Sequence, residues 1–248
     1  MGTATLTDCT RPSADRASIG AAESLPALTL TPLHHVLPDG SLVRVTTAPA
    51  PMLLNGLFGD QAWLALQLVA GLNPTANPSL GGVGLVRESE LPRGEGAGWI
   101  LAPFVRTPGP GNGSRFSDGA HGVWYGANTL PTAQAEVGYH PARWLATSEA
   151  APDRLECSVV IAHADRGCPL VDLRSAEGLP RDVLHPGHYV TSQPFGAACR
   201  RTDFWGLLWP SVRAEGLSAG SFRPRALRQA QQLSTCHAIW DGMRVTWA

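Results

Sequence analysis

With 248 residues, a formal net charge of −1 and 44% hydrophobic residues, the chain has the composition of one large or two small globular domains. The balanced charge argues against a protein that binds nucleic acid mainly through phosphate contacts, although a local basic patch stays open. All 19 basic residues are arginines, so a Schiff-base lysine, a P-loop lysine and a catalytic ammonium group are excluded.

The cysteine pattern favours reduced thiols. Five cysteines lie far apart without a C-x-x-C pair, which makes a disulfide or zinc framework the weaker interpretation. The N-terminus lacks the apolar run of a signal peptide, and no stretch of about 18 apolar residues occurs. We therefore expect a cytoplasmic protein that does not span a membrane.

The beginning of the sequence contains few strong signals. Residues 1–28 are rich in Thr, Ser, Ala and Asp without periodicity, and we interpret them as a flexible leader before a single domain at 29–248. Asp60 can cap a helix over 61–70, and an apolar run predicts a strand over 99–105.

An alternating pattern predicts a strand over residues 42–47. Alternation places Val43 and Val45 on one face of this strand and Arg44 on the other. If the valines face the core, Arg44 faces a cleft or the solvent. The alternative to a site residue is a solvated arginine on an edge strand.

The segment 113–140 holds the residues best suited to chemistry. Residues 122–127 are expected to form a short strand that carries Tyr125. Thr129 can cap the free N–H groups of a following helix, and Pro141 predicts that this helix ends just before it.

Three residues of this helix share one face. Ala133, Glu136 and His140 follow one another at i, i+3 and i+7. A carboxylate on such a face needs a partner or a catalytic role, so Glu136 is either a reactive group or the ion-pair partner of Arg115. His140 either tunes Glu136 or is a satisfied interior histidine.

Later segments alternate between apolar runs and turns, which indicates an α+β domain built on a mixed, two-part sheet. We predict strands over 155–162, 170–173 and 204–209, a short helix over 226–232, and a hairpin over 237–245 with its turn at Asp241-Gly242.

Two loops suggest ligands. His185 and His188 are close in sequence, but the Pro-Gly between them indicates a turn and no third ligand follows at a metal-binding spacing. We therefore predict no metal site. The glycine-rich loop 108–113 is either a connector or a cradle of N–H groups for an anion.

Five short motifs follow one another between roughly residues 40 and 248. They are Arg44 in the first strand, Arg115-Phe116 after a glycine, Tyr125, Thr132-Ala133-Gln134-Ala135-Glu136-Val137, and Trp209-Pro210-Ser211-Val212-Arg213. Together they resemble the RES domain family, the toxin half of RES-Xre toxin–antitoxin pairs. The resemblance implies a fold similar to the ADP-ribosyltransferase toxins, with NAD in a cleft, and a small Xre-type antitoxin as partner.

The resemblance also implies roles for individual residues in cleaving the bond between nicotinamide and ribose, through a transition state comparable to glycoside cleavage. The implied catalytic residues are Glu136, which stabilises positive charge at the ribose, Tyr125, whose ring stacks, and Arg44. Arg44 and Arg115 suit phosphate or ribose oxygens, and Ser211 and Arg213 complete the phosphate or acceptor side. Phe116 and Trp124 are expected in the core.

The sequence leaves several alternatives open. Water, phosphate or a protein side chain can accept the ADP-ribose, which distinguishes a glycohydrolase, a phosphorylase and a mono-ADP-ribosyltransferase. A catalytically inactive interaction protein with the same fold is the other class. We expect no direct binding of nucleic acid and no metal cofactor, and a homo-oligomer is left open.

Overall fold

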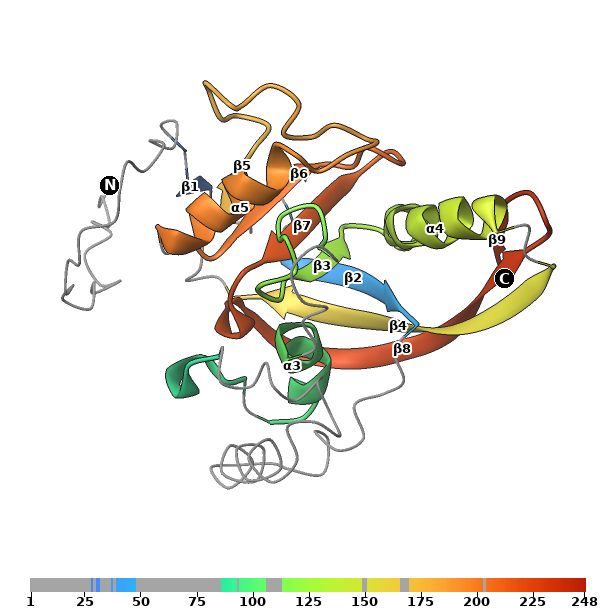
Figure 1. Ribbon diagram of the computed structural model, residues 1–248. Coiled ribbons are helices and arrows are strands. Elements are labelled where there is room, and N and C mark those ends of the chain that lie inside the picture. The colour runs from blue at the N-terminus through green and yellow to red at the C-terminus, as the bar shows by residue number, and fades with distance from the viewer. Residues whose placement is uncertain are drawn as a thin grey trace, which may run out of the picture.

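The computed structural model describes residues 28, 30–31, 37, 39–47, 86–92, 94–105, 113–148, 151–165, 170–202 and 204–248. Within these ranges one sheet has the strand order β1-β5-β6-β7-β3-β2-β4-β8-β9 (Figure 1). The strands are β1 (Leu30–Thr31), β2 (Ser41–Thr46), β3 (Trp124–Ala127), β4 (Asp153–Ala164), β5 (Leu170–Asp172), β6 (Gly206–Pro210), β7 (Leu217–Ser221), β8 (Leu227–Trp240) and β9 (Val245–Trp247). The helices are α3 (Ala97–Val105), α4 (Leu130–Thr147) and α5 (Ser192–Arg201), with 3-10 turns η3 (Glu88–Glu90) and η4 (Pro224–Ala226).

The sheet has two wings. One wing contains β1, β5, β6, β7 and β3, and the other contains β2, β4, β8 and β9. β5 and β6 are parallel while the other neighbouring pairs are antiparallel, so the sheet is mixed. β2 pairs with β4 along its whole length but with β3 only where Val43 lies opposite Ala127. The predicted α+β domain with a mixed sheet is confirmed, and its two parts meet between β2 and β3.

Helices cover both faces of the sheet. α3 packs on one face against β8 and β3, while α4 lies on the other face against β2 (Figure 1). Alternation in β2 explains this arrangement, because Leu42 belongs to the core under α3 whereas Val45 belongs to the core under α4. α5 contributes Phe195 and Cys199 to a third core on the wing that contains β5 and β6.

The start of α4 was predicted correctly, but its end was not. Thr129 caps the helix, because its hydroxyl accepts a hydrogen bond from the Thr132 N–H. The helix nevertheless continues through Pro141 to Thr147. Proline removes one helical hydrogen bond, and the mostly exposed last turns leave its ring room on the solvent side.

Two predicted elements are wrong. The strand expected over 99–105 is helix α3, which is buried on most sides and therefore lacks a helical period of polar residues. The helix expected over 226–232 is the beginning of β8. Pairing with β4 overrides the local helix propensity there, and Gln229 adopts a positive φ of 53° where the register between the two strands shifts.

The strands and the hairpin predicted for the later part of the chain agree with the structure. β4, β5 and β6 occupy the strands expected over 155–162, 170–173 and 204–209. β8 and β9 form the expected hairpin, in which the Asp241 carboxylate accepts from the N–H groups of Met243 and Arg244. The leader apart from residue 28, the helix over 61–70 and most of the loop over 108–113 lie outside the described residues. None of the helices that the structure describes is long and apolar enough to cross a membrane.

Candidate active site

A pocket of about 280 Å³ opens at the junction of the two wings, where residues of β2, β3 and α4 line it. Four of the residues predicted for the site line this pocket, and they come from four separate segments: Arg44, Arg115, Tyr125 and Glu136. The other lining residues that carry polar groups or rings are Ser114, His140, Tyr189, Trp209 and Ser218.

A tight turn directs Arg115 to the pocket. Ser114 and Ser117 form a β-bridge, in which the Ser114 N–H donates to the Ser117 carbonyl over 2.7 Å. Phe116, between them, is fully buried and packs edge-on against Trp209 at 4.9 Å. The buried ring fixes the turn, so the neighbouring arginine projects toward the pocket. As expected, Phe116 and Trp124 belong to the core.

The Arg115 guanidinium is buried but only partly paired. Its Nη1 donates to the His185 carbonyl at 3.0 Å, and its Cζ lies 4.9 Å from the centroid of the Tyr189 ring. Its Nη2 is buried and has no hydrogen-bond partner among the described residues. Burial lowers the pKa of Arg115, while Tyr189 and Glu136 oppose this shift. A buried donor without a partner is costly, so this nitrogen suits an anionic ligand oxygen.

Tyr125 supplies the pocket with a ring, but its hydroxyl is engaged elsewhere. The hydroxyl oxygen accepts from the Phe116 N–H at 3.0 Å and lies 2.8 Å from the Ser114 hydroxyl. Burial raises the pKa of Tyr125 to about 12, so the hydroxyl stays protonated at neutral pH. Besides lining the pocket, Tyr125 holds the turn that carries Arg115.

Arg44 lies along the junction between β2 and β3. Its Nη1 donates to the Tyr125 carbonyl at 3.1 Å, and its Cζ is 5.7 Å from the centroid of the Trp124 ring. Burial lowers the pKa of Arg44 to about 10, which still leaves the guanidinium charged at neutral pH.

Glu136 is held by serines. The Ser211 hydroxyl donates to its Oε1 over 2.5 Å, and the Ser218 hydroxyl lies 3.4 Å from the same oxygen. Ser211 is itself fixed, because its oxygen accepts from the N–H groups of Arg213 and Ala214. In the described part of the chain, Glu136 makes its hydrogen bonds to these serines rather than to Arg115.

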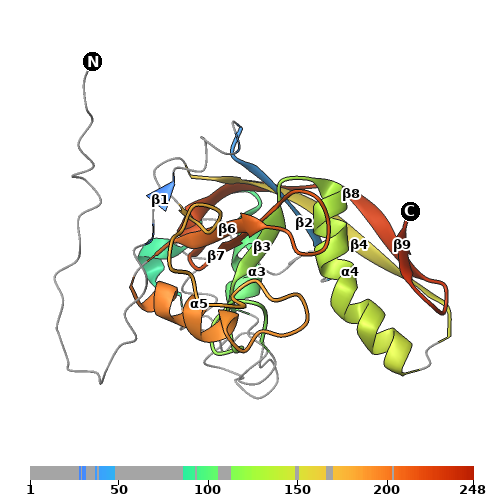
Figure 2. The same ribbon diagram turned by 90° about the horizontal axis from the view of Figure 1, so that it is seen from above.

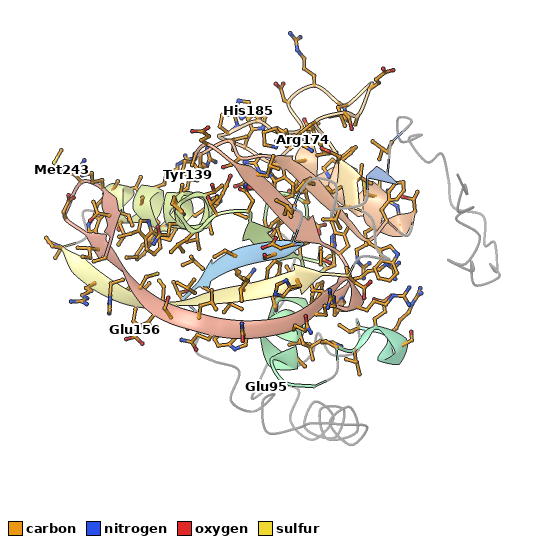
Figure 3. The ribbon with its side chains drawn as sticks, turned by 180° about the vertical axis from the view of Figure 1, so that it is seen from behind. Glu95, Tyr139, Glu156, Arg174, His185 and Met243 are labelled. Carbon is orange, nitrogen blue, oxygen red and sulfur yellow. The ribbon has the colours of Figure 1, made fainter. Side chains whose placement is uncertain are left out.

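Arg213 lies beside the pocket and does not line it. Its guanidinium stacks on Tyr139 of α4, 3.4 Å from the ring centroid, and donates to the Pro186 carbonyl. Its Nε is buried and finds no partner in the described ranges. Figure 3 shows that Tyr139 and His185 lie on the same side of the sheet, so Arg213 links α4 with the loop before α5.

Sequence reasoning missed Tyr189 and Ser218. Tyr189 lies in the loop between β5 and α5, and its hydroxyl is 2.6 Å from His140 Nε2. Among the described residues, the hydrogen-bond partner of the His140 ring is therefore this tyrosine and not Glu136. Ser218 reaches the pocket from β7. Neither residue belongs to a motif with a recognisable spacing, so only the fold reveals them.

The two histidines of the turn at 185–188 stack on each other at 3.7 Å. His185 Nδ1 accepts from the N–H groups of Gly187 and His188, which closes the predicted turn. Within the described ranges, no three His, Cys, Asp or Glu side chains gather as a set of metal ligands.

A family model for the RES domain matches residues 90–241. The chain therefore belongs to the RES domain family, and the resemblance drawn from its motifs is confirmed. The matched range begins after Arg44 and contains the other predicted site residues, namely Arg115, Tyr125, Glu136, Ser211 and Arg213.

Among solved structures, the chain is similar to one in the crystal structure of the M. tuberculosis MbcT–MbcA toxin–antitoxin complex. The two chains are 20% identical, the similarity covers 50% of this chain and 73% of that chain, and the TM-score is 0.36. No curated protein matches the chain.

Proposed function

We propose that this protein is an NAD-consuming enzyme that cleaves the bond between nicotinamide and ribose. The observation that carries the proposal is the convergence of Arg44, Arg115, Tyr125 and Glu136 on one pocket. The pocket thus combines cations for a pyrophosphate, an aromatic ring and a fixed carboxylate, as the reaction requires. Membership of the RES domain family supports the same reaction class.

Glu136 is the proposed stabiliser of the transition state. Departure of nicotinamide leaves positive charge on the ribose, as in glycoside cleavage. A carboxylate that is already oriented stabilises this charge without reorganising during the reaction, and low local polarity strengthens the effect. The hydrogen bond from Ser211 holds Oε1 in place and leaves Oε2 for the ribose.

Arg44 and Arg115 are the proposed anion ligands. Both are arginines, whose planar groups match phosphate oxygens with two parallel N–H donors. Arg44 keeps its charge because burial lowers its pKa only to about 10. Arg115 offers its Nη2, which no described residue pairs. Ser211 and Arg213 act from the adjoining side, where Ser211 orients Glu136 and Arg213 supplies a further positive charge.

Tyr125 is proposed to stack on the nicotinamide with its ring, since its hydroxyl is bound within the protein. A volume of about 280 Å³ is at the small end of the range for ligand sites, so the pocket suits part of a dinucleotide, with the remainder outside it.

Family membership also leads us to propose a small Xre-type antitoxin as partner and a cytoplasmic location. An inhibitor that binds over the pocket would prevent NAD loss before it is needed. Examination of the neighbouring genes for one that encodes a small helix-turn-helix protein tests this context first. Growth arrest on production of this protein in a bacterial host, relieved by co-production of such a neighbour, supports the proposal.

Incubation of the purified protein with NAD tests the reaction. We expect free nicotinamide to accumulate in the presence of a metal chelator, because the proposed chemistry uses only protein side chains. Reactions with and without phosphate distinguish an ADP-ribose phosphate ester from ADP-ribose, and transfer of labelled ADP-ribose to protein identifies the third acceptor class. Absence of both NAD binding and nicotinamide release would favour the inactive interaction protein.

A further inference from the structure

Tyr189 connects two side chains of the pocket that come from different parts of the chain. Its ring lies beneath the Arg115 guanidinium, with 4.9 Å between Cζ and the ring centroid. Its hydroxyl lies 2.6 Å from His140 Nε2 on α4. Figure 2 shows the loop that carries Tyr189, in orange, between α5 and α4. One tyrosine thus joins the helix of Glu136 to the arginine of the Ser114–Ser117 turn.

The loop that carries Tyr189 is fixed at both ends. On its N-terminal side, Val183 is buried and the carbonyls of His185 and Pro186 accept hydrogen bonds from Arg115 and Arg213. On its C-terminal side, the Tyr189 carbonyl accepts from the Gln193 N–H in the first turn of α5. The ring therefore has a defined place before a ligand binds.

The same region restrains the turn of Arg115 from a second direction. The Gln193 side chain donates to the Ser114 carbonyl at 3.1 Å. The Tyr189 ring lies on one side of Arg115 and the His185 carbonyl on another. Within the part of the chain that the structure describes, the donor group Nη2 of Arg115 stays buried without a partner. Arginine side chains lose much rotamer freedom when they bind, so restraint before binding favours affinity.

We propose that Tyr189 is a positioning residue that, supported by His140, holds Arg115 ready for an anionic oxygen of the nucleotide. This inference rests on the proposed NAD-cleaving function. Tyr189 acts through Arg115 in substrate binding, while Glu136 acts on the ribose. Loss of the Tyr189 ring therefore weakens binding of NAD more than it slows the bound reaction.

Steady-state kinetics on Tyr189→Leu and Tyr189→Phe test the proposal. We expect Tyr189→Leu to raise KM for NAD about 10-fold with less than about a threefold change in kcat, since it removes the cation–π contact. Tyr189→Phe keeps the ring but loses the hydroxyl contact with His140, so its KM should lie between those of the unmodified protein and Tyr189→Leu, at most about threefold above the former. Val190→Ala, at an exposed neighbouring position of the same loop, is the matched control and should behave as the unmodified protein.

A double-mutant cycle with Arg115→Gln separates positioning from a general structural role. If Tyr189 acts through Arg115, adding Tyr189→Leu to Arg115→Gln should raise KM by less than about twofold more. An additional 10-fold rise in the double variant, or an unchanged KM in Tyr189→Leu, would overturn the inference.

Melting curves accompany each measurement. If Tyr189→Leu does not fold at the assay temperature, Tyr189→Met replaces it with the same expected rise in KM, because it retains more side-chain volume. If the unmodified protein fails to release nicotinamide, the proposed function itself fails. If that protein is active and Tyr189→Leu binds NAD normally, only the role of Tyr189 fails.

Discussion

Replacing Glu136 with glutamine removes a negative charge from the pocket and changes the shape of the side chain very little. The amide oxygen of glutamine can still accept the hydrogen bond that Ser211 donates to Oε1 over 2.5 Å. The Ser218 hydroxyl, 3.4 Å from the same oxygen, also keeps its hydrogen-bond acceptor. Because the hydrogen bonds of Glu136 run to serines, the replacement does not strand the Arg115 guanidinium.

The expected effect is therefore large on the rate and small on stability. If Glu136 stabilises the ribose as proposed, loss of its charge should lower kcat by roughly 10²- to 10⁴-fold, which corresponds to about 3 to 5 kcal/mol. Exchanging a charged for a neutral hydrogen-bond acceptor should cost about 1 kcal/mol of unfolding free energy. For a domain of this size, that cost lowers Tm by about 2 to 4 °C. Nicotinamide release and a thermal melt measure the two effects on one preparation.

Glu156→Gln is a suitable control, because Glu156 is an exposed glutamate on β4 that does not line the pocket (Figure 3). It should keep the activity and Tm of the unmodified protein. A catalytic role of Glu136 is refuted if Glu136→Gln costs about 3 to 5 kcal/mol of stability, as expected for a disrupted buried ion pair, while its folded fraction keeps near-normal specific activity.

Two further predictions concern residues around the pocket. Tyr125→Phe leaves the Phe116 N–H without its partner, so we expect a loss of about 1 to 3 kcal/mol in urea unfolding together with a raised KM for NAD; unchanged stability would contradict the observed hydrogen bond. The pKa of His140 is lowered below its ordinary 6.5. Partial burial is the largest cause, and the nearby positive charges of Arg213, Arg143 and Arg115 act in the same direction. The unfolded chain therefore takes up this proton first, and stability should fall as pH drops from about 6.5 toward the lower folded-state pKa. His140→Gln should reduce this pH dependence, and an identical dependence in both proteins would show that His140 does not cause it.

Local sequence patterns predicted the structure correctly where one short segment determines the local conformation. Thr129 caps α4 as predicted, and the helical spacing of Ala133, Glu136 and His140 places all three along the pocket. The turn at Asp241-Gly242 closes a hairpin because an aspartate followed by glycine favours that backbone geometry. These outcomes depend on interactions between residues a few positions apart.

The remaining features depend on contacts between distant residues. Tyr189 reaches Arg115 only because the loop before α5 folds against the turn at Ser114–Ser117. The sequence of α3 led to the prediction of a strand, because this helix is buried on most sides and lacks the periodic polar residues that indicate a helix. The start of β8 contains good helix formers, but pairing with β4 decides its conformation.

The location of the pocket follows from incomplete pairing between the two wings. β3 pairs with β7 along its whole length, yet it meets β2 at a single registered position. A Cβ atom on Gly126 would lie 2.5 Å from the Trp124 ring and 3.1 Å from the Val43 carbonyl oxygen, so the junction tolerates no larger residue there. The divergence brings Arg44 of one wing beside the Tyr125 carbonyl of the other. α4 then covers this junction and presents Glu136 to it, so the proposed catalytic carboxylate and two arginines meet where β2 and β3 share a single registered pair.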